Sequence, residues 1–197
     1  MGGITVEYSA KQIAARIAQM GRQISRDYST RQIDVVVILD SAFIFASDLV
    51  RRITVPSICH FVRSEIRDIN LGGHARREIF FSYEPELRGR DVLVVDAVLH
   101  SGVTLDFLVK RLHETRPGSL RVAVLLDKPQ DRKVDLNPEY FGFHAASNYL
   151  VGYGLPGDKG LQRNLPYVGS VRRRRASRAV RPSRGGRKGA GKARGKK

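Results

Sequence analysis

The sequence predicts an α/β domain with a doubly wound, mainly parallel sheet. The strongest evidence is three short runs at residues 35–39, 92–95 and 122–126, which consist of apolar, mostly β-branched residues. Runs of this kind are typical of strands that are covered on both faces. Stretches with helical spacing of apolar residues lie between them, as in other α/β folds, whose ligands bind at the carboxyl ends of the strands.

The first helix is predicted over residues 9–26. Ser9, followed three residues later by Gln12, has the spacing of a capping box. Apolar residues then recur at intervals of four, three and four, at Ile13, Ile17, Met20 and Ile24. We expect this stripe to face the core and to carry no chemistry.

A βαβ unit is predicted after this helix. The strand at 35–39 ends at Asp40 and Ser41, residues 42–52 have the pattern of a packed helix, and residues 55–62 return to strand character. Two parallel strands joined by a helix place their carboxyl ends at the same edge of the sheet.

The stretch between this unit and the strand at 92–95 is predicted to be largely irregular. Residues 63–77 are polar, contain Gly72 and Gly73 and have no clear period, so we expect a mobile loop. A short strand is predicted at 79–83.

Cys59 is the only cysteine, and it lies in the apolar run at 58–62. We expect it to be a small core residue and not a nucleophile. The chain can form neither an intrachain disulfide nor a thiolate zinc site, and no apolar run approaches the roughly 20 residues that cross a bilayer. These features favour a cytoplasmic location without membrane insertion.

Residues 172–197 differ in composition from the rest of the chain. They contain 13 of the 35 Lys and Arg residues and no acid, whereas residues 1–171 carry 22 basic and 19 acidic groups. Such a segment cannot bury enough apolar surface to offset its ordering entropy, so we predict a domain at 1–171 and a disordered tail.

The basic tail suggests a polyanionic partner. Its charge would bind nucleic acid by counterion release, with little base specificity because it has no aromatic residue. A solubilising extension is the alternative. The first candidate nucleic-acid contacts are four consecutive arginines: Arg172, Arg173, Arg174 and Arg175.

Residues 92–104, VLVVDAVLHSGVT, place an acid at a strand end and a hydroxyl-glycine turn at the start of a helix. The first N–H groups of a helix lack intrahelical partners, Gly102 permits close approach, and Ser101 and Thr104 carry hydroxyls that can donate. A phosphate monoester would fit there. From spacing alone, the alternative is that Ser101 only caps the helix and Asp96 only ends the strand.

This segment resembles the phosphoribosyl diphosphate motif of the type I phosphoribosyltransferases. The whole chain resembles a divergent member of the bacterial hypoxanthine or hypoxanthine-guanine phosphoribosyltransferases over most of residues 10–171. Six blocks carry the resemblance in order: SAFIFASDLVRRI at 41–53, RGRDVLVVD at 88–96, RVAVLLDKP at 121–129, RKVDLNPEYFGF at 132–143, YLVGYGL at 149–155 and RNLPYVG at 163–169. The resemblance implies a small hood formed by the chain ends, a purine salvage role, phosphoribosyl diphosphate and purine nucleotide as ligands, Mg²⁺ as cofactor, and a homodimer or homotetramer.

On the sugar side, the resemblance assigns Asp96 to the first of two acids that hold the ribose hydroxyls. Ala97 stands at the second acid, where it offers no oxygen. His100 stands at the catalytic aspartate; it can take a proton near neutral pH but lacks a fixed negative charge. The positions that match the cradle of the 5′-phosphate are Ser101, Gly102, Val103 and Thr104.

On the purine side, Lys128 matches the lysine that donates to the exocyclic oxygen, Tyr149 the stacking aromatic, and Leu150 the apolar position after it. Without the resemblance, Lys128 would be interpreted as a surface lysine and Tyr149 as a core strand residue.

On the diphosphate side, Arg163 matches the arginine of the family. Pro156 stands where the family has a magnesium-side aspartate, which leaves Asp158 as a weak metal candidate. Asp40 and Ser41 replace a Lys-Gly pair, and a carboxylate beside a polyanion has the wrong sign.

The candidate residues therefore divide by function: groups for binding a nucleoside monophosphate are mostly kept, and groups for magnesium diphosphate and proton transfer are mostly replaced. We expect a hypoxanthine/guanine phosphoribosyltransferase-like protein that binds purine nucleoside 5′-monophosphate, with phosphoribosyl transfer weakened or lost. One alternative is an active transferase with His100 as base. The other is a nucleic-acid-associated protein that acts through its tail.

Overall fold

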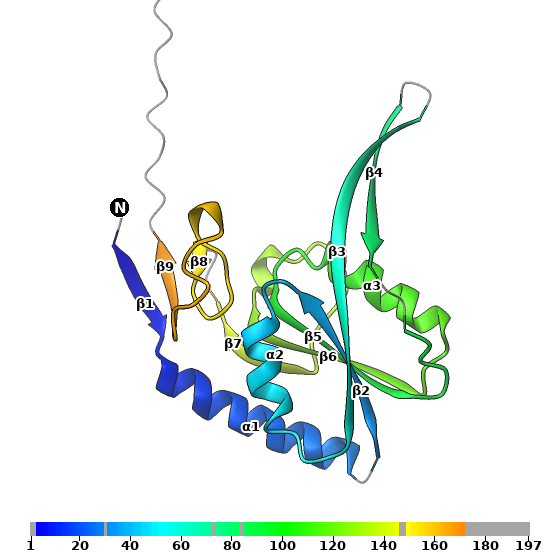
Figure 1. Ribbon diagram of the computed structural model, residues 1–197, viewed down its shortest axis with the longest axis horizontal. Coiled ribbons are helices and arrows are strands. Elements are labelled where there is room, and N and C mark those ends of the chain that lie inside the picture. The colour runs from blue at the N-terminus through cyan, green and yellow to red at the C-terminus, as the bar shows by residue number, and fades with distance from the viewer. Residues whose placement is uncertain (1–2, 30, 72–73, 83–84, 146–148, 172–197) are drawn as a thin grey trace, which may run out of the picture.

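The computed structural model describes residues 3–29, 31–71, 74–82, 85–145 and 149–171, which form two sheets and three helices (Figure 1). The larger sheet has the strand order β4-β3-β2-β5-β6-β7. Its strands are β2 (Ile33–Leu39), β3 (Ser57–Leu71), β4 (His74–Phe81), β5 (Asp91–Leu99), β6 (Ser119–Asp127) and β7 (Tyr140–His144). The smaller sheet has the order β1-β9-β8 and consists of β1 (Ile4–Tyr8), β9 (Val168–Val171) and β8 (Tyr149–Val151).

The larger sheet is doubly wound, as predicted. The strands from β3 through β2, β5 and β6 to β7 are parallel, and only the edge strand β4 is antiparallel to its neighbour. The helices are α1 (Ala10–Tyr28), α2 (Phe43–Val50) and α3 (Val103–Glu114). Along β2, Val35 and Val37 pack in the core cluster of α1 and α2, whereas Val36 and Ile38 pack in the cluster of α3. Helices therefore cover both faces.

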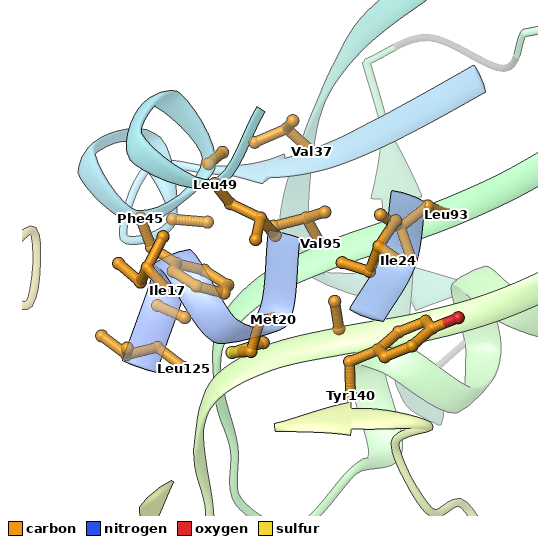
Figure 2. Packing of buried hydrophobic residues seen from close by; sticks show 14 of the residues in the cluster. Ile17, Met20, Ile24, Val37, Phe45, Leu49, Leu93, Val95, Leu125 and Tyr140 are labelled. Atoms are coloured by element: carbon orange, nitrogen blue, oxygen red, sulfur yellow. The ribbon is translucent and has the colours of Figure 1, made fainter. Parts of the chain in front are cut away.

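The first helix confirms the predicted capping box. The Gln12 N–H lies 3.4 Å from Ser9 Oγ, and the Ser9 N–H donates to Gln12 Oε1 at 2.9 Å. The predicted apolar stripe of α1 is buried against β5, β6 and α2 (Figure 2). The stripe therefore faces the core, as predicted.

Residues 63–77 were predicted to be a mobile loop, and this is wrong. β3 continues to Leu71 and pairs with β4 in an antiparallel hairpin that projects beyond the rest of the sheet (Figure 1). Hydrophobic periodicity arises where one face of a strand is buried, whereas a projecting hairpin is held by its backbone hydrogen bonds, so residues 63–77 have no periodic pattern. Residues 79–81 of the predicted strand at 79–83 form the end of β4, and residue 83 lies outside the described residues.

Cys59 was predicted to be a core residue, but it is exposed. The reason is that α2 packs against β2 and β5 and leaves the same face of β3 open, where Phe61 is also 56% exposed. A second departure lies between β6 and β7. No α-helix joins them in the described residues, only the 3₁₀ turn Pro129–Asp131 and an irregular segment.

The smaller sheet is the hood that the family resemblance implied. β9 pairs antiparallel with both β1 and β8, so the first and last described strands lie side by side (Figure 1). The Tyr8 hydroxyl donates to the His144 carbonyl at 2.7 Å and joins the hood to the end of β7. The predicted tail at 172–197, with its four arginines, lies outside the described residues. No described helix has the length and apolar character needed to cross a membrane.

Candidate phosphoribosyl site

A hollow of about 280 Å³ opens at the carboxyl ends of β2 and β5, beside the middle of β3. This is the edge at which an α/β sheet binds ligands. It brings together Asp96, His100, Ser101, Gly102 and Thr104 from the predicted site. The β2 end and β3 add Asp40, Ser41 and Ser64. The side chain of Val103, which begins α3, is 45% exposed, and Val103 is not among the residues that line the hollow.

The start of α3 has the geometry of an anion cradle. Gly102 is the N-cap residue, with φ at 79°, and no side chain caps the first turn. Gly102, and not Ser101, is therefore the N-cap residue of α3, and the first N–H groups remain available to a ligand. Asp106, the acid of the first turn, is paired with Lys110 at 2.7 Å, which offsets its charge.

The segment after β6 holds this cradle from behind. Three successive carbonyls accept hydrogen bonds from it: Leu99 from the Lys128 N–H at 3.0 Å, His100 from Arg132 Nε at 3.2 Å, and Ser101 from the Lys133 N–H at 2.9 Å. These three carbonyl oxygens are therefore already hydrogen-bonded to the segment behind the cradle.

Arg132 is a site residue that the sequence analysis missed. Its side chain is only 10% exposed, and its guanidinium also donates to the Asp127 carboxylate and to the Leu136 carbonyl. In a chain with 35 Lys and Arg residues, composition could not distinguish this buried arginine from the solvated ones.

Asp96 lies in the hollow with its carboxylate partly buried. Burial raises the pKa of Asp96 from 3.8 to about 6, and the N–H groups of Ala97 and Val98 oppose the shift by hydrogen bonding. The Ala97 N–H is 2.6 Å from Asp96 Oδ1. Above about pH 6 the group is a carboxylate that can accept from the hydroxyls of a sugar.

This shift predicts a pH-dependent gain in stability for Asp96→Asn. Folding takes up a proton at Asp96 between about pH 4 and pH 6, so the stability contributed by this group is present at low pH and is lost as the pH rises through that window. Removing the charge should raise the free energy of unfolding by about 1–3 kcal/mol at pH 8 and by less at pH 5. Urea unfolding at both values measures it. A gain of equal size at both would contradict the prediction, and Asp135→Asn, at an exposed acid, is the control.

Ala97 does not face the hollow. It is fully buried in the core cluster of α1 and α2, on the other face of β5. Its methyl group offers no oxygen to a ligand, and an acid placed there would be buried in an apolar cluster at a cost of several kcal/mol.

The charge of Asp40 is less unfavourable than the sequence analysis implied. Arg63 Nη2 lies 2.8 Å from Asp40 Oδ1 because residues 39 and 63 are in register across β2 and β3. The pair brings a cation to the mouth of the hollow. Arg163 reaches the same wall: it donates to the Gly154 carbonyl at 2.7 Å, and its Nη1 is 3.5 Å from Ser41 Oγ.

None of the purine-side residues is among the groups that line the hollow. Lys128 is 7% exposed, so it is not the surface lysine that composition alone would suggest. Tyr149, in β8, is 42% exposed and its hydroxyl donates to the Pro156 carbonyl at 3.3 Å, so it is not a core residue either. Leu150 packs against the core of α1 and α2.

The residues present do not fit a magnesium ion held by the protein. Within the described part of the chain, no three His, Cys, Asp or Glu residues cluster as metal ligands. Asp158 is exposed on the 3₁₀ turn Asp158–Gly160 and does not line the hollow. Mg²⁺ is commonly bound by few carboxylates together with the phosphates of a substrate, so here it would enter with diphosphate.

A doubly wound sheet, a glycine turn that opens a helix at the strand ends and a hood made by the chain ends define a protein of the type I phosphoribosyltransferase class. The family model for the phosphoribosyl transferase domain matches residues 7–156. The hypoxanthine-guanine phosphoribosyltransferase of Mycobacterium avium is 34% identical over 173 residues, which cover 85% of each chain. The hypoxanthine phosphoribosyltransferase of Salmonella typhimurium is 35% identical over 162 residues, covering 81% of this chain and 90% of the relative.

The structural comparison agrees with these matches. A crystal structure of a hypoxanthine-guanine phosphoribosyltransferase from Bacillus anthracis superimposes with a TM-score of 0.75 at 32% identity, covering 87% of this chain and 99% of that one. The chain belongs to the hypoxanthine-guanine phosphoribosyltransferase family.

Proposed function

We propose that this site binds a purine nucleoside 5′-monophosphate and catalyses phosphoribosyl transfer to hypoxanthine or guanine more slowly than an enzyme with the family's full acid set. The observation that carries the binding proposal is the start of α3 at Gly102, where no side chain of the N-cap residue occupies the first N–H groups. Ser101 and Thr104, on either side of this start, line the hollow and carry hydroxyl groups. Asp96 supplies an acceptor for the ribose beside it.

The slow transfer is argued from the groups that handle charge. Ala97 offers no oxygen and faces the core, and Asp40 uses Arg63 as its partner. Asp158 is outside the hollow. The magnesium diphosphate leaving group therefore meets fewer fixed partners, which weakens electrostatic stabilisation of the transition state.

Calorimetry with inosine and guanosine monophosphates tests the binding. We expect both to bind, and Thr104→Val to weaken binding by about tenfold because it removes one hydrogen bond to a charged group. Thr115→Val is the matched control, because Thr115 lies just past the other end of α3 and donates to the Leu112 carbonyl at 2.8 Å. If neither nucleotide binds, the proposal fails.

Transfer is tested by incubating the protein with magnesium, phosphoribosyl diphosphate and each oxopurine while nucleotide formation is followed. We expect measurable but slow turnover. Turnover as fast as that of the Salmonella relative, measured in parallel, would contradict the weakened site.

The tail supports a second proposed function, because residues 172–197 contain 13 Lys and Arg residues and no acid. We propose that it holds the protein on nucleic acid without base specificity, with affinity that falls steeply with salt. Deletion of residues 172–197 should abolish binding to duplex DNA in an anisotropy titration and leave inosine monophosphate binding intact. DNA binding that survives the deletion would exclude the tail as its source.

A further inference from the structure

His100 is paired with an acid that no sequence pattern connects to it. His100 follows β5 and lines the hollow, and its Nε2 lies 3.1 Å from Oδ2 of Asp131. Asp131 is the last residue of the 3₁₀ turn Pro129–Asp131, which comes directly after Lys128. The segment that carries the purine-side lysine thus also brings a carboxylate to the imidazole.

The cation next to Asp131 in the chain is engaged by other groups. Arg132, the adjacent cation, is engaged by the Asp127 carboxylate and by the carbonyls of Leu136 and His100. The Asp131 Oδ2 atom is inaccessible to solvent, and no described residue gives it a well-aligned hydrogen bond, so a small rotation of the imidazole would satisfy it.

Two further acids face the same hollow. Asp40 is paired with Arg63, and Asp96 is held by backbone N–H groups.

We propose that Asp131 is a positioning residue that makes His100 the proton acceptor of phosphoribosyl transfer. The inference rests on the proposed transferase function. With Nε2–H directed to the carboxylate, the neutral imidazole keeps its Nδ1 lone pair for the purine. The pair carries a net charge of −1 before it takes a proton and zero afterwards, which matches a single aspartate in both states. The His100–Asp131 pair thereby supplies both the base and the negative charge that the family's catalytic carboxylate supplies.

The purine N9 lone pair forms the bond to C1′ of phosphoribosyl diphosphate, and the C1′–O bond breaks with its electron pair leaving on diphosphate. The proton on N7 passes to Nδ1 of His100. The resulting imidazolium lies beside the Asp131 carboxylate, so the positive charge that develops on the ribose does not meet an uncompensated cation.

The test compares Asp131→Asn with Asp135→Asn in the full chain. Asp135 is an exposed acid four residues further along the same segment, so it controls for the loss of one negative charge. We expect Asp131→Asn to lower kcat by about 10- to 100-fold, because the imidazole loses the carboxylate that orients it. Asp135→Asn should leave kcat unchanged, and both variants should bind inosine monophosphate as the wild type does.

A second variant separates positioning from a structural role. In His100→Asp the base is itself a carboxylate, so adding Asp131→Asn should change kcat by less than about twofold. An unchanged kcat in Asp131→Asn would overturn the inference, and so would an equal loss of kcat in the His100→Asp background. Wild-type protein that binds inosine monophosphate but transfers no phosphoribosyl group overturns it while the proposed binding stands. Absence of binding overturns the proposed function itself.

Discussion

Gly102→Ala is expected to abolish binding of inosine monophosphate and to lower the free energy of unfolding by about 2–4 kcal/mol. Two effects add. Gly102 has φ at 79°, a conformation that costs a residue with a side chain. A Cβ atom there would also lie 2.7 Å from Cγ2 of Val134 and 3.0 Å from Cδ of Arg132. The Arg132 side chain cannot move aside freely, because its guanidinium is anchored on Asp127 and on two carbonyls.

The chain offers a control that separates the two effects. Gly89 has a similar φ of 68°, and a Cβ atom there would meet nothing within 4 Å. Gly89→Ala should therefore cost about 1 kcal/mol from backbone strain alone and leave nucleotide binding unchanged. Urea unfolding and calorimetry on both variants measure the difference. If the two substitutions lower the free energy of unfolding equally, the contacts of the added Cβ with Val134 and Arg132 do not destabilise the protein.

The elements that the sequence predicted well are those whose signal is local. The apolar runs of β2, β5 and β6 are buried on both faces, and the capping box at Ser9 fixes where α1 begins. The turn at Gly102 was also predictable, because a glycine between a strand end and an amphipathic helix is typical of a tight turn. In each case a few neighbouring residues determine the structure.

The parts that could not be predicted depend on contacts between distant segments. His100 and Asp131 are brought together only by the pairing of β5 with β6 and by the turn that follows, and the turn has neither helical nor strand period. The exposure of Cys59 is set by how far α2 extends across the sheet, which its own sequence does not report. To predict that Ala97 faces the core, one would need to know which face of β5 each of its residues lies on, and this depends on how β5 packs in the sheet. Much of the candidate site is therefore determined by tertiary contacts, which local sequence patterns do not predict.

Asp34→Ala should lower the free energy of unfolding by about 2–4 kcal/mol, although Asp34 lies far from the ligand edge of the sheet. Asp34 is only 3% exposed and lies near the start of β2, a strand with a neighbour on each side. Its two oxygens lie 2.8 Å from His60 Nε2 and 2.8 Å from Arg90 Nε, respectively. Removal of the acid leaves both partners without the carboxylate around which they are placed. The loss stays at the lower end of the range for buried pairs, because the Arg90 side chain is 42% exposed and can be rehydrated.

Asp40→Ala is the matched comparison, because the Asp40–Arg63 distance is also 2.8 Å but both side chains are more than half exposed. An exposed pair contributes at most about 1 kcal/mol, so its loss should be small in the same urea titration. Asp34→Asn, which keeps the shape and removes the charge, should fall between the two. If Asp34→Ala and Asp40→Ala unfold at the same urea concentration, burial of the Asp34 carboxylate adds nothing to the strength of its pairing. A larger loss for Asp34→Ala would assign the difference to burial, since the distances are the same.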